Sequence, residues 1–291
     1  MRRSMLFLPG NNPAMLANGD SFGSDSIILD LEDAVSPGEK DAARILVRNT
    51  LKYFHYRGPE IIIRINSLDT SYWKADLEAV LPYRPDVIMP TKVSGAAYIR
   101  ELSDYVSTLE KDSGAKEGST RIMPLLETTL GIENAFEIAK SSPRMTALYL
   151  GAEDLTADMR CRRTKKGDEI FYSRSRLVSA ARAAGLDVYD TPFTDIDDPS
   201  GLRADTELAK GLGFTGKAAI NPRQIPCINE VFSPSEADIL YAQEVFEAIR
   251  LAKEQGKGAI SLRGKMIDAP IVERARQVLE TARIIEGGVM Q

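Results

Sequence analysis

Acidic residues follow several apolar, strand-like stretches of this sequence. Glu127 ends "RIMPLLE", Glu153 and Asp154 end "TALYLGAED", and Glu32 and Asp33 end "SIILDLED". A buried charge is costly unless it has a partner, so an acid at the end of a buried stretch needs a reason. Carboxylate oxygens, together with water and substrate oxygens, suit a hard divalent cation such as Mg2+. The pattern therefore indicates a metal site.

Two of these acids, Glu127 and Asp154, follow consecutive strand-like stretches, so we expect their carboxylates to share one ion. Water and substrate would fill the remaining positions around it. Such an ion polarises a substrate carbonyl and stabilises an enolate or an alkoxide. Arg64, near the end of "EIIIRIN", is expected to clamp a carboxylate or the same developing oxyanion.

Other interpretations of these residues stay open at this point. A single acid at the end of a strand is often a helix cap or the partner of a lysine, and Glu153 fits that description. Arg64 can equally form a buried ion pair with Asp30 or Glu32. Lys92, which ends "IMPTK", can be a Schiff-base lysine, which would make the protein a class I aldolase.

The elements that position these residues form a regular alternation. Apolar, β-rich stretches alternate with amphipathic helical patterns, which predicts a parallel sheet covered by helices. No G-x-G-x-x-G follows an early strand, which disfavours a dinucleotide-binding fold. Eight such units predict a (β/α)8 TIM barrel, with the acids at the carboxyl ends of the strands, where barrels place their active sites. The predicted strands are residues 4–10, 25–33, 60–66, 85–92, 120–128, 146–154, 186–193 and 213–221.

The chain continues well beyond the eighth predicted strand. We assign residues 1–232 to the barrel and residues 233–291 to a helical C-terminal extension. Glycines at positions 256, 258 and 264 mark a turn or a short hairpin before a final helix. We expect the extension to act as a lid or an oligomerisation arm, packed on or near the mouth of the active site of its own or a neighbouring subunit.

Composition excludes several classes of function. The net charge of −5 and the scattered basic residues give no reason to expect a nucleic acid or an anionic membrane as partner. No apolar stretch has the length of a membrane span, and the N-terminal one is too short for a signal peptide. Two distant cysteines fit free thiols in the cytoplasm. A single histidine, His55, argues against Ser–His or Cys–His catalysis and against a zinc site rich in histidine.

Longer motifs carry a resemblance to a known family. The sequence resembles the citrate lyase β-subunit group of the acyl-CoA lyase/aldolase superfamily over nearly its whole length. The segment "MRCRRTKKGDEIFYSRSRLVSAARAAG" is similar to the citrate lyase branch, and Asn221 stands where malyl-CoA and citramalyl-CoA lyases often have a histidine. The other motifs are "RRSMLFLPGNNPAM", "DSIILDLEDAVSPGEKDAAR", "IIIRIN", "LLETTLGIENAFEIA", "LGAEDLTADM", "GFTGKAAINPRQI" and "GKMIDAPIVERA".

The resemblance implies a carbon–carbon lyase that depends on Mg2+, with Mn2+ as the alternative ion. It would cleave a citryl thioester to oxaloacetate and an acetyl thioester. Glu127 and Asp154 match the metal ligands, and Glu127 would also face the substrate. Arg64 matches a catalytic arginine that contacts the α-keto acid product and the thioester region.

The resemblance also assigns residues at the two ends of the chain. Arg3 and the Pro9–Asn12 loop, which includes Gly10 and Asn11, match a segment that lines the pocket and the thioester arm. Asp268, in "GKMID", matches a catalytic acid that reaches the site from a neighbouring subunit in related lyases. The extension would then be a lid that acts in trans.

The implied partners are a citryl-CoA or citryl-acyl-carrier substrate, and the α and acyl-carrier subunits of a citrate lyase complex. A homo-oligomer, either a trimer or a hexamer, is expected. Two alternatives stay open. One is a lyase for another 3-hydroxyacyl-CoA, such as malyl-CoA or citramalyl-CoA, and the other is a non-catalytic subunit on the same fold.

Overall fold

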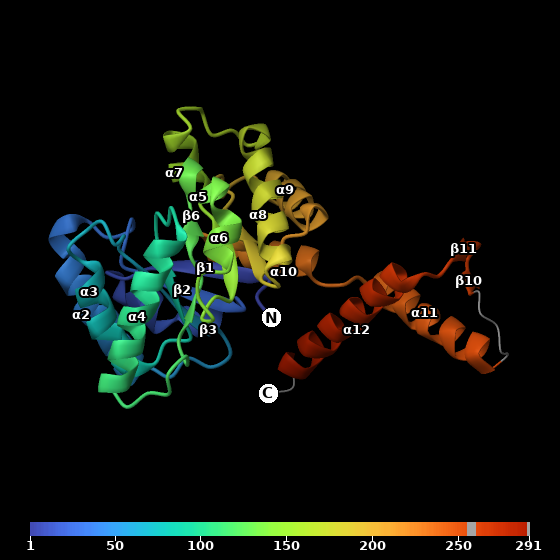
Figure 1. Ribbon diagram of the computed structural model, residues 1–291, viewed down its shortest axis with the longest axis horizontal. Coiled ribbons are helices and arrows are strands. Elements are labelled where there is room, and N and C mark those ends of the chain that lie inside the picture. Colours follow the sequence, from blue (N-terminus) through green and yellow to red (C-terminus); the bar gives the residue numbers. More distant parts are fainter. Residues whose placement is uncertain (255–259, 290–291) are drawn as a thin grey trace. The chain divides into compact units, whose positions relative to one another are not determined.

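A curled, parallel β-sheet forms the centre of the larger part of the protein (Figure 1). The computed structural model describes residues 1–254 and 260–289. Among these, nine strands join in the order β5-β4-β3-β2-β1-β9-β8-β7-β6. The strands are β1 Ser4–Pro9, β2 Ser26–Asp30, β3 Glu60–Ile65, β4 Val87–Pro90, β5 Arg121–Ile122, β6 Leu125–Leu126, β7 Ala147–Leu150, β8 Asp187–Asp190 and β9 Gly216–Ala219.

Helices follow the strands and cover the sheet (Figure 1). Each of the longer ones has one apolar face, as in α2, where Ala43 and Val47 are buried one helical turn apart. Continuous apolar strands form because both faces of the sheet are buried. The helices of this part are α1 Pro13–Ala17, α2 Lys40–Tyr53, α3 Trp73–Val80, α4 Ala96–Asp112, α5 Thr129–Glu133, α6 Ala135–Ala139, α7 Ala152–Asp158, α8 Phe171–Ala183, α9 Pro199–Leu212 and α10 Ile225–Phe232.

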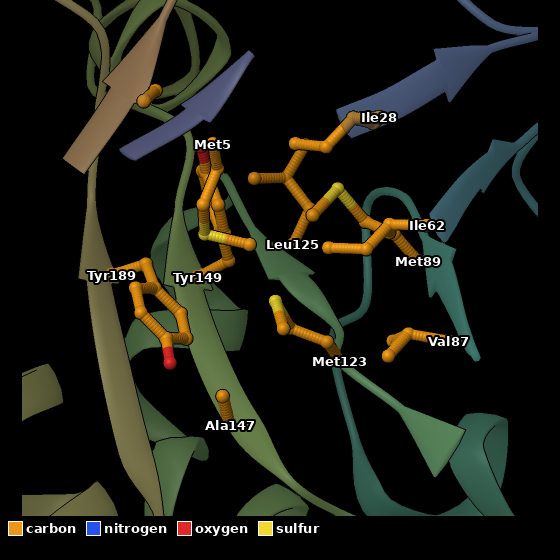
Figure 2. Close-up of a cluster of buried hydrophobic side chains, with 11 residues drawn as sticks. Met5, Ile28, Ile62, Val87, Met89, Met123, Leu125, Ala147, Tyr149 and Tyr189 are labelled. Atoms are coloured by element: carbon orange, nitrogen blue, oxygen red, sulfur yellow. The ribbon is translucent and has the colours of Figure 1, made fainter. Parts of the chain in front are cut away.

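Buried side chains fill the inside of the curled sheet. They come from alternate positions along several strands, such as Ile62 of β3 and Val87 of β4 (Figure 2). Met5, Met89 and Met123 lie in the same cluster, and flexible methionines fill irregular gaps of this kind. Because the interior is packed, a substrate site has to form at the ends of the strands.

The register of the sheet sets which residues meet at those ends. Pro9 pairs with Asp30, and Asp30 pairs with Arg64 in the next strand. All three strands run in the same direction, so these residues share one level at the carboxyl ends of β1, β2 and β3. Residues that precede the strands, such as Arg3 and Asp25, belong to the opposite end of the sheet.

The chain divides into two compact units, Arg2–Asn229 and Glu230–Gln291, the latter together with Met1. The second unit contains α11 Glu236–Glu254, the hairpin β10 Ser261–Leu262 and β11 Lys265–Met266, and α12 Ala269–Val289. Ala242, Val245 and Ala275 form its buried apolar core. The predicted hairpin and final helix are confirmed, and Gly264 has the left-handed φ of 76° that a tight turn needs. Gly256 and Gly258 lie outside the described residues.

The structure confirms the parallel α/β architecture, and the predicted strand at 120–128 is divided. Pro124 has no amide hydrogen to donate, and it separates β5 from β6. Closure into a full eight-stranded barrel stays a prediction, as do the division of the chain at residue 232 and the lid role of residues 233–291. None of the helices in residues 1–254 and 260–289 is long and apolar enough to cross a membrane.

Candidate active site

A cavity of about 470 Å³ lies at the carboxyl ends of the strands. Most of its lining residues end a strand or begin the loop that follows one. The predicted site residues Pro9, Arg64, Glu127 and Asp154 all line it. Acids from different strands and an arginine therefore line one cavity, as predicted.

Arg64 is held by acids from the neighbouring strand β2 and its loop. Its Nε lies 2.7 Å from Oδ1 of Asp30, and its Nη1 lies 3.3 Å from Oε2 of Glu32. The guanidinium also lies over the ring of Phe7, 5.0 Å from its centroid. Burial alone would lower the pKa of Arg64, but the acids, Asp30 foremost, raise it overall. Arg64 is thus a fixed cation, and the alternative that it pairs with Asp30 or Glu32 is found for both acids.

Glu127 is an unusual acid because its side chain is almost fully buried, with 3% of its surface exposed. Burial raises the pKa of Glu127 to about 8, and the nearby carboxylates of Glu32 and Asp154 add to that rise. Its Oε1 accepts a hydrogen bond of 2.9 Å from the backbone N–H of Lys92. A carboxyl group in such surroundings is one that a bound cation would stabilise in its charged form.

Lys92 bridges two of the acids around the cavity. Its Nζ lies 3.2 Å from Oε1 of Glu32 and 3.4 Å from Oδ2 of Asp154. Burial would lower the pKa of this amine, but Glu32 and Asp154 raise it above its ordinary value. A Schiff-base lysine needs a lowered pKa, so this environment argues against the Schiff-base interpretation. The φ of 55° at Lys92 is the kind of backbone strain that clusters at functional sites.

Asp154 lies in the first turn of α7, a short helix that begins directly after β7. Gly151 precedes the helix and lies against Glu127. A Cβ at Gly151 would come within 2.7 Å of both Cβ and Oε2 of Glu127. Only glycine leaves room for Glu127 at this turn, which brings the strand of Glu127 and the helix of Asp154 together.

These residues fit a Mg2+ site of the predicted type. In the described part of the chain, no group of three or more His, Cys, Asp and Glu residues is arranged to hold a metal ion. A site with two carboxylates, completed by water and substrate, is nevertheless common for Mg2+, which keeps several waters. The amine of Lys92 already lies beside Asp154, and burial together with the carboxylates of Glu32 and Asp154 raises the pKa of Glu127, so a cation between the two acids would relieve their repulsion.

Arg3, Gly10 and Asn11, which were predicted to line the pocket, belong to the same unit as the cavity but do not line it. Arg3 lies at the opposite end of the sheet, where its Nη2 is 2.8 Å from Oδ1 of Asp25. The Asn11 amide donates to Oε2 of Glu39 at 2.9 Å. Gly10 N–H donates to the backbone oxygen of Asp30 at 2.8 Å, and a Cβ at Gly10 would be 2.4 Å from that oxygen. Gly10 thus sets the path of the chain beside Pro9.

Asp268 belongs to the second unit of the chain. It directly precedes α12, and its Oδ1 accepts the N–H of Ile271 at 3.1 Å. This contact is the kind that a helix-capping acid makes. A catalytic role for Asp268 stays a prediction.

Aromatic residues of the cavity were not predicted from the sequence. Phe7 and Tyr149 line it, and their rings pack edge to face with centroids 6.2 Å apart. Phe7 lies two positions before the predicted residue Pro9 on β1. Side chains two apart on a strand lie on the same face, so this spacing could have predicted that Phe7 lines the cavity.

A parallel α/β sheet with two carboxylates and a fixed arginine at its strand ends is the arrangement of an enzyme that stabilises an oxyanion with a divalent cation. The chain belongs to the HpcH/HpaI aldolase/citrate lyase family, whose sequence profile matches residues 3–222.

Individual relatives agree with that family. The citrate lyase subunit beta of Leuconostoc mesenteroides subsp. cremoris is 46% identical over 282 residues, which cover 97% of this chain and 93% of the relative. The crystal structure of CitE from Mycobacterium tuberculosis in complex with magnesium, acetoacetate and coenzyme A is similar, with a TM-score of 0.78 and 30% identity over 97% of this chain and 98% of that one.

A further similar structure is the citrate lyase beta subunit complexed with oxaloacetate and magnesium from M. tuberculosis. Its TM-score is 0.68 and its identity 30%, over 80% of this chain and 97% of that one.

Proposed function

We propose that this chain is a Mg2+-dependent carbon–carbon lyase that cleaves a citryl thioester to oxaloacetate and an acetyl thioester. The observation that carries the proposal is the meeting of Glu127, Asp154 and the fixed Arg64 in one cavity. Similarity to the citrate lyase subunit beta of L. mesenteroides, and to the structure of a citrate lyase beta subunit complexed with oxaloacetate and magnesium, supports the same reaction.

Each of these residues has a role in the proposed reaction. Glu127 and Asp154 would hold Mg2+, which when bound polarises the substrate oxygens next to the bond that breaks. Arg64 would bind a carboxylate of the α-keto acid and offset negative charge on the thioester oxygen. Its pairing with Asp30 keeps the guanidinium in one orientation, so the charge is in place before the reaction begins.

The bond changes are those of a retro-aldol cleavage. The tertiary hydroxyl of the citryl group loses its proton, and its oxygen becomes the keto oxygen of oxaloacetate. The carbon–carbon bond breaks, and its electrons form the enolate of the acetyl thioester, which then takes up a proton. Asp268, supplied by the C-terminal extension of the same or a neighbouring subunit, is the group that we assign to proton transfer: its carboxylate would take up the hydroxyl proton and then return a proton to the enolate carbon.

Pro9 lines the cavity, and Gly10 and Asn11 follow it in the chain. We assign this loop to the side of the pocket where the thioester arm enters. Mn2+ could take the place of Mg2+, because both prefer oxygen ligands.

We also propose that the sheet closes into an eight-stranded barrel. Only Met123 and Pro124 separate its two edge strands, β5 and β6. Met123 N–H donates to Ile88 O of β4, and Pro124 O accepts from Tyr149 N–H of β7, both at 3.0 Å. These bonds support treating residues 121–126 as one interrupted strand. Residues 1–232 would form the barrel and residues 233–291 a lid or oligomer arm.

The thioester would be carried on CoA or on an acyl-carrier subunit, with an α subunit forming the citryl thioester. This assignment rests on the β-subunit relatives. We place such an assembly, with this chain as a trimer or hexamer, in the cytoplasm.

The decisive experiment is cleavage of citryl-CoA by the purified chain with and without Mg2+. Oxaloacetate is detected by coupling to malate dehydrogenase and NADH. Oxaloacetate release that needs Mg2+ and stops with EDTA is the expected result. Cleavage of malyl-CoA or citramalyl-CoA instead would keep the reaction type and change the substrate. Inactivity on all three, and on a carrier-bound citryl thioester, would favour a non-catalytic subunit.

A further inference from the structure

Thr191 connects two neighbouring elements of the site. It directly follows β8, and its side chain is fully buried. Its Oγ1 accepts a hydrogen bond of 3.1 Å from the backbone N–H of Ala152, the first residue of α7. The first amides of a helix have no partners within the helix and need an outside acceptor. Thr191 supplies that acceptor from an adjacent strand.

The N-cap position of α7 contributes no side-chain hydrogen bond to the start of the helix. Gly151 occupies that position and has no side chain, whereas α5 and α9 are capped by Thr128 and Asp198 of their own segments. A larger residue at Gly151 would collide with Glu127. Glycine at the N-cap position thus leaves room for Glu127 and provides no local cap. The Thr191 hydroxyl accepts instead from the first amide of the helix, one that a local cap does not reach.

Thr191 is itself fixed by a buried network of charges. Lys217 Nζ donates to Thr191 O at 2.7 Å and to Oδ2 of Asp190 at 2.6 Å. Arg174 binds Asp190 through Nε at 2.9 Å and Asp205 through Nη2 at 2.7 Å. All four charged residues are buried, with at most 5% of the surface exposed.

This network has two positive and two negative groups, which come from α8, α9, β8 and β9. Buried charges are stable only in well-defined geometry with their hydrogen bonds made. Lys217 can satisfy its donors only if Thr191 O keeps its position. The network therefore fixes the end of β8, and through it the acceptor for α7.

We infer that Thr191 is a positioning residue that sets the first turn of α7, and so the direction of the Asp154 carboxylate. The inference rests on the proposed function, in which Asp154 holds Mg2+. Thr191 lines the cavity, but its hydroxyl oxygen is engaged by the Ala152 amide, and it is through this bond that it acts on Asp154. Partners that orient metal ligands without touching the metal usually affect metal affinity strongly.

The test is the Mg2+ affinity of the full-length protein, measured by isothermal titration calorimetry with Mg2+ alone. Thr191→Val keeps the shape and removes the acceptor, and we expect its dissociation constant for Mg2+ to rise about 10- to 100-fold. Thr191→Ser keeps the hydroxyl and should stay within about twofold of the unmodified protein. Thr206→Val is the matched control, since this buried threonine of α9 donates only to Leu202 O of its own helix.

The results separate the inference from the proposed function. Equal Mg2+ affinity in Thr191→Val and the unmodified protein, at an unchanged melting temperature, would overturn the inference and leave the lyase assignment intact. An unmodified protein that binds no Mg2+ would overturn the metal site itself, and the inference with it. If Thr191→Val does not fold, Thr191→Ala against Thr191→Ser tests the same hydroxyl, and equal affinities in that pair would also overturn it.

Discussion

Negative charge dominates the cavity. Among the described residues that line it, Arg64 is the basic one, whereas the acids are Asp30, Asp33, Glu127, Glu153 and Asp154. Two of these acids, Asp30 and Asp33, pair with Arg64. Glu153 lies 3.6 Å from Arg163, Asp154 lies beside the amine of Lys92, and Glu127 accepts from the backbone N–H of Lys92. This excess of acids favours a divalent cation over an anion.

Glu127→Gln and Asp154→Asn are expected to lower Mg2+-dependent turnover by more than about 100-fold each, because each removes a charged ligand of a two-carboxylate site. The fold should be retained, since a neutral amide in place of the Glu127 carboxylate avoids the cost of burying a charge. Citryl-CoA cleavage at saturating Mg2+ and circular dichroism measure the two effects.

The matched control is Glu101→Gln, an exposed acid of α4, which should leave turnover unchanged. Near-normal activity in both site variants would refute the metal assignment.

Whether a predicted site residue lines the cavity depends on which end of its strand it is near. The sequence predicted Arg64, Glu127 and Asp154 together because each follows an apolar run, and parallel strands end at one edge. Arg3 precedes its strand, so the same rule places it at the far end, beside Asp25. The contacts of Lys92 with Glu32 and Asp154 join residues far apart in the sequence, and no local pattern encodes them.

At the scale of elements, the turn from β7 into α7 controls how closely the two proposed metal ligands approach. Gly151→Ala is expected to reduce turnover and Mg2+ affinity by about 10-fold or more, because the new Cβ would displace Glu127. The φ of −105° at Gly151 is ordinary for alanine, so the effect is steric. Calorimetry with Mg2+ and the coupled assay give the two values.

Gly211→Ala is the control for this substitution. Gly211 lies within α9 and has no atom within 4 Å of the position of a new Cβ, so alanine should slightly stabilise the helix. Equal Mg2+ affinity in Gly151→Ala and Gly211→Ala would show that Glu127 does not depend on this turn.

Strands with an apolar run were predictable from the sequence, and a short helix with little apolar periodicity was not. Each of the eight predicted strand segments contains a strand, because a continuous apolar run is a strong signal. The predicted segments extend beyond the strands at their carboxyl ends, where site residues continue the pattern, as at 146–154. α7 was missed because its seven residues carry the site acids and little apolar periodicity. The break at Pro124 was visible in the sequence, but its effect on pairing was not.

At the scale of the whole molecule, the chain contains a second unit with its own apolar core, centred on Ala242, Val245 and Ala275. The unit consists of two helices joined by a hairpin, and Asp268 lies just before the second helix. The sequence predicted the helices of this unit from their period.

Asp268 can be tested so that its capping and acid functions are separated. Asn caps a helix about as well as Asp, so Asp268→Asn should keep the contact to Ile271 and the melting temperature. If Asp268 transfers a proton, the same variant loses most of its kcat with KM little changed. Asp268→Ala would lose the activity and also about 1 kcal/mol of stability through the lost cap.

Mixed oligomers then show which subunit supplies the acid. Asp268→Asn protein mixed with Arg64→Ala protein, after dissociation and reassembly, regains part of the activity if Asp268 acts on a neighbouring subunit, because some sites then receive both intact residues. No recovery, with each variant still assembling, would place Asp268 in the site of its own chain. Full activity in Asp268→Asn alone would leave this residue as a helix cap, and the proton would have to come from another group.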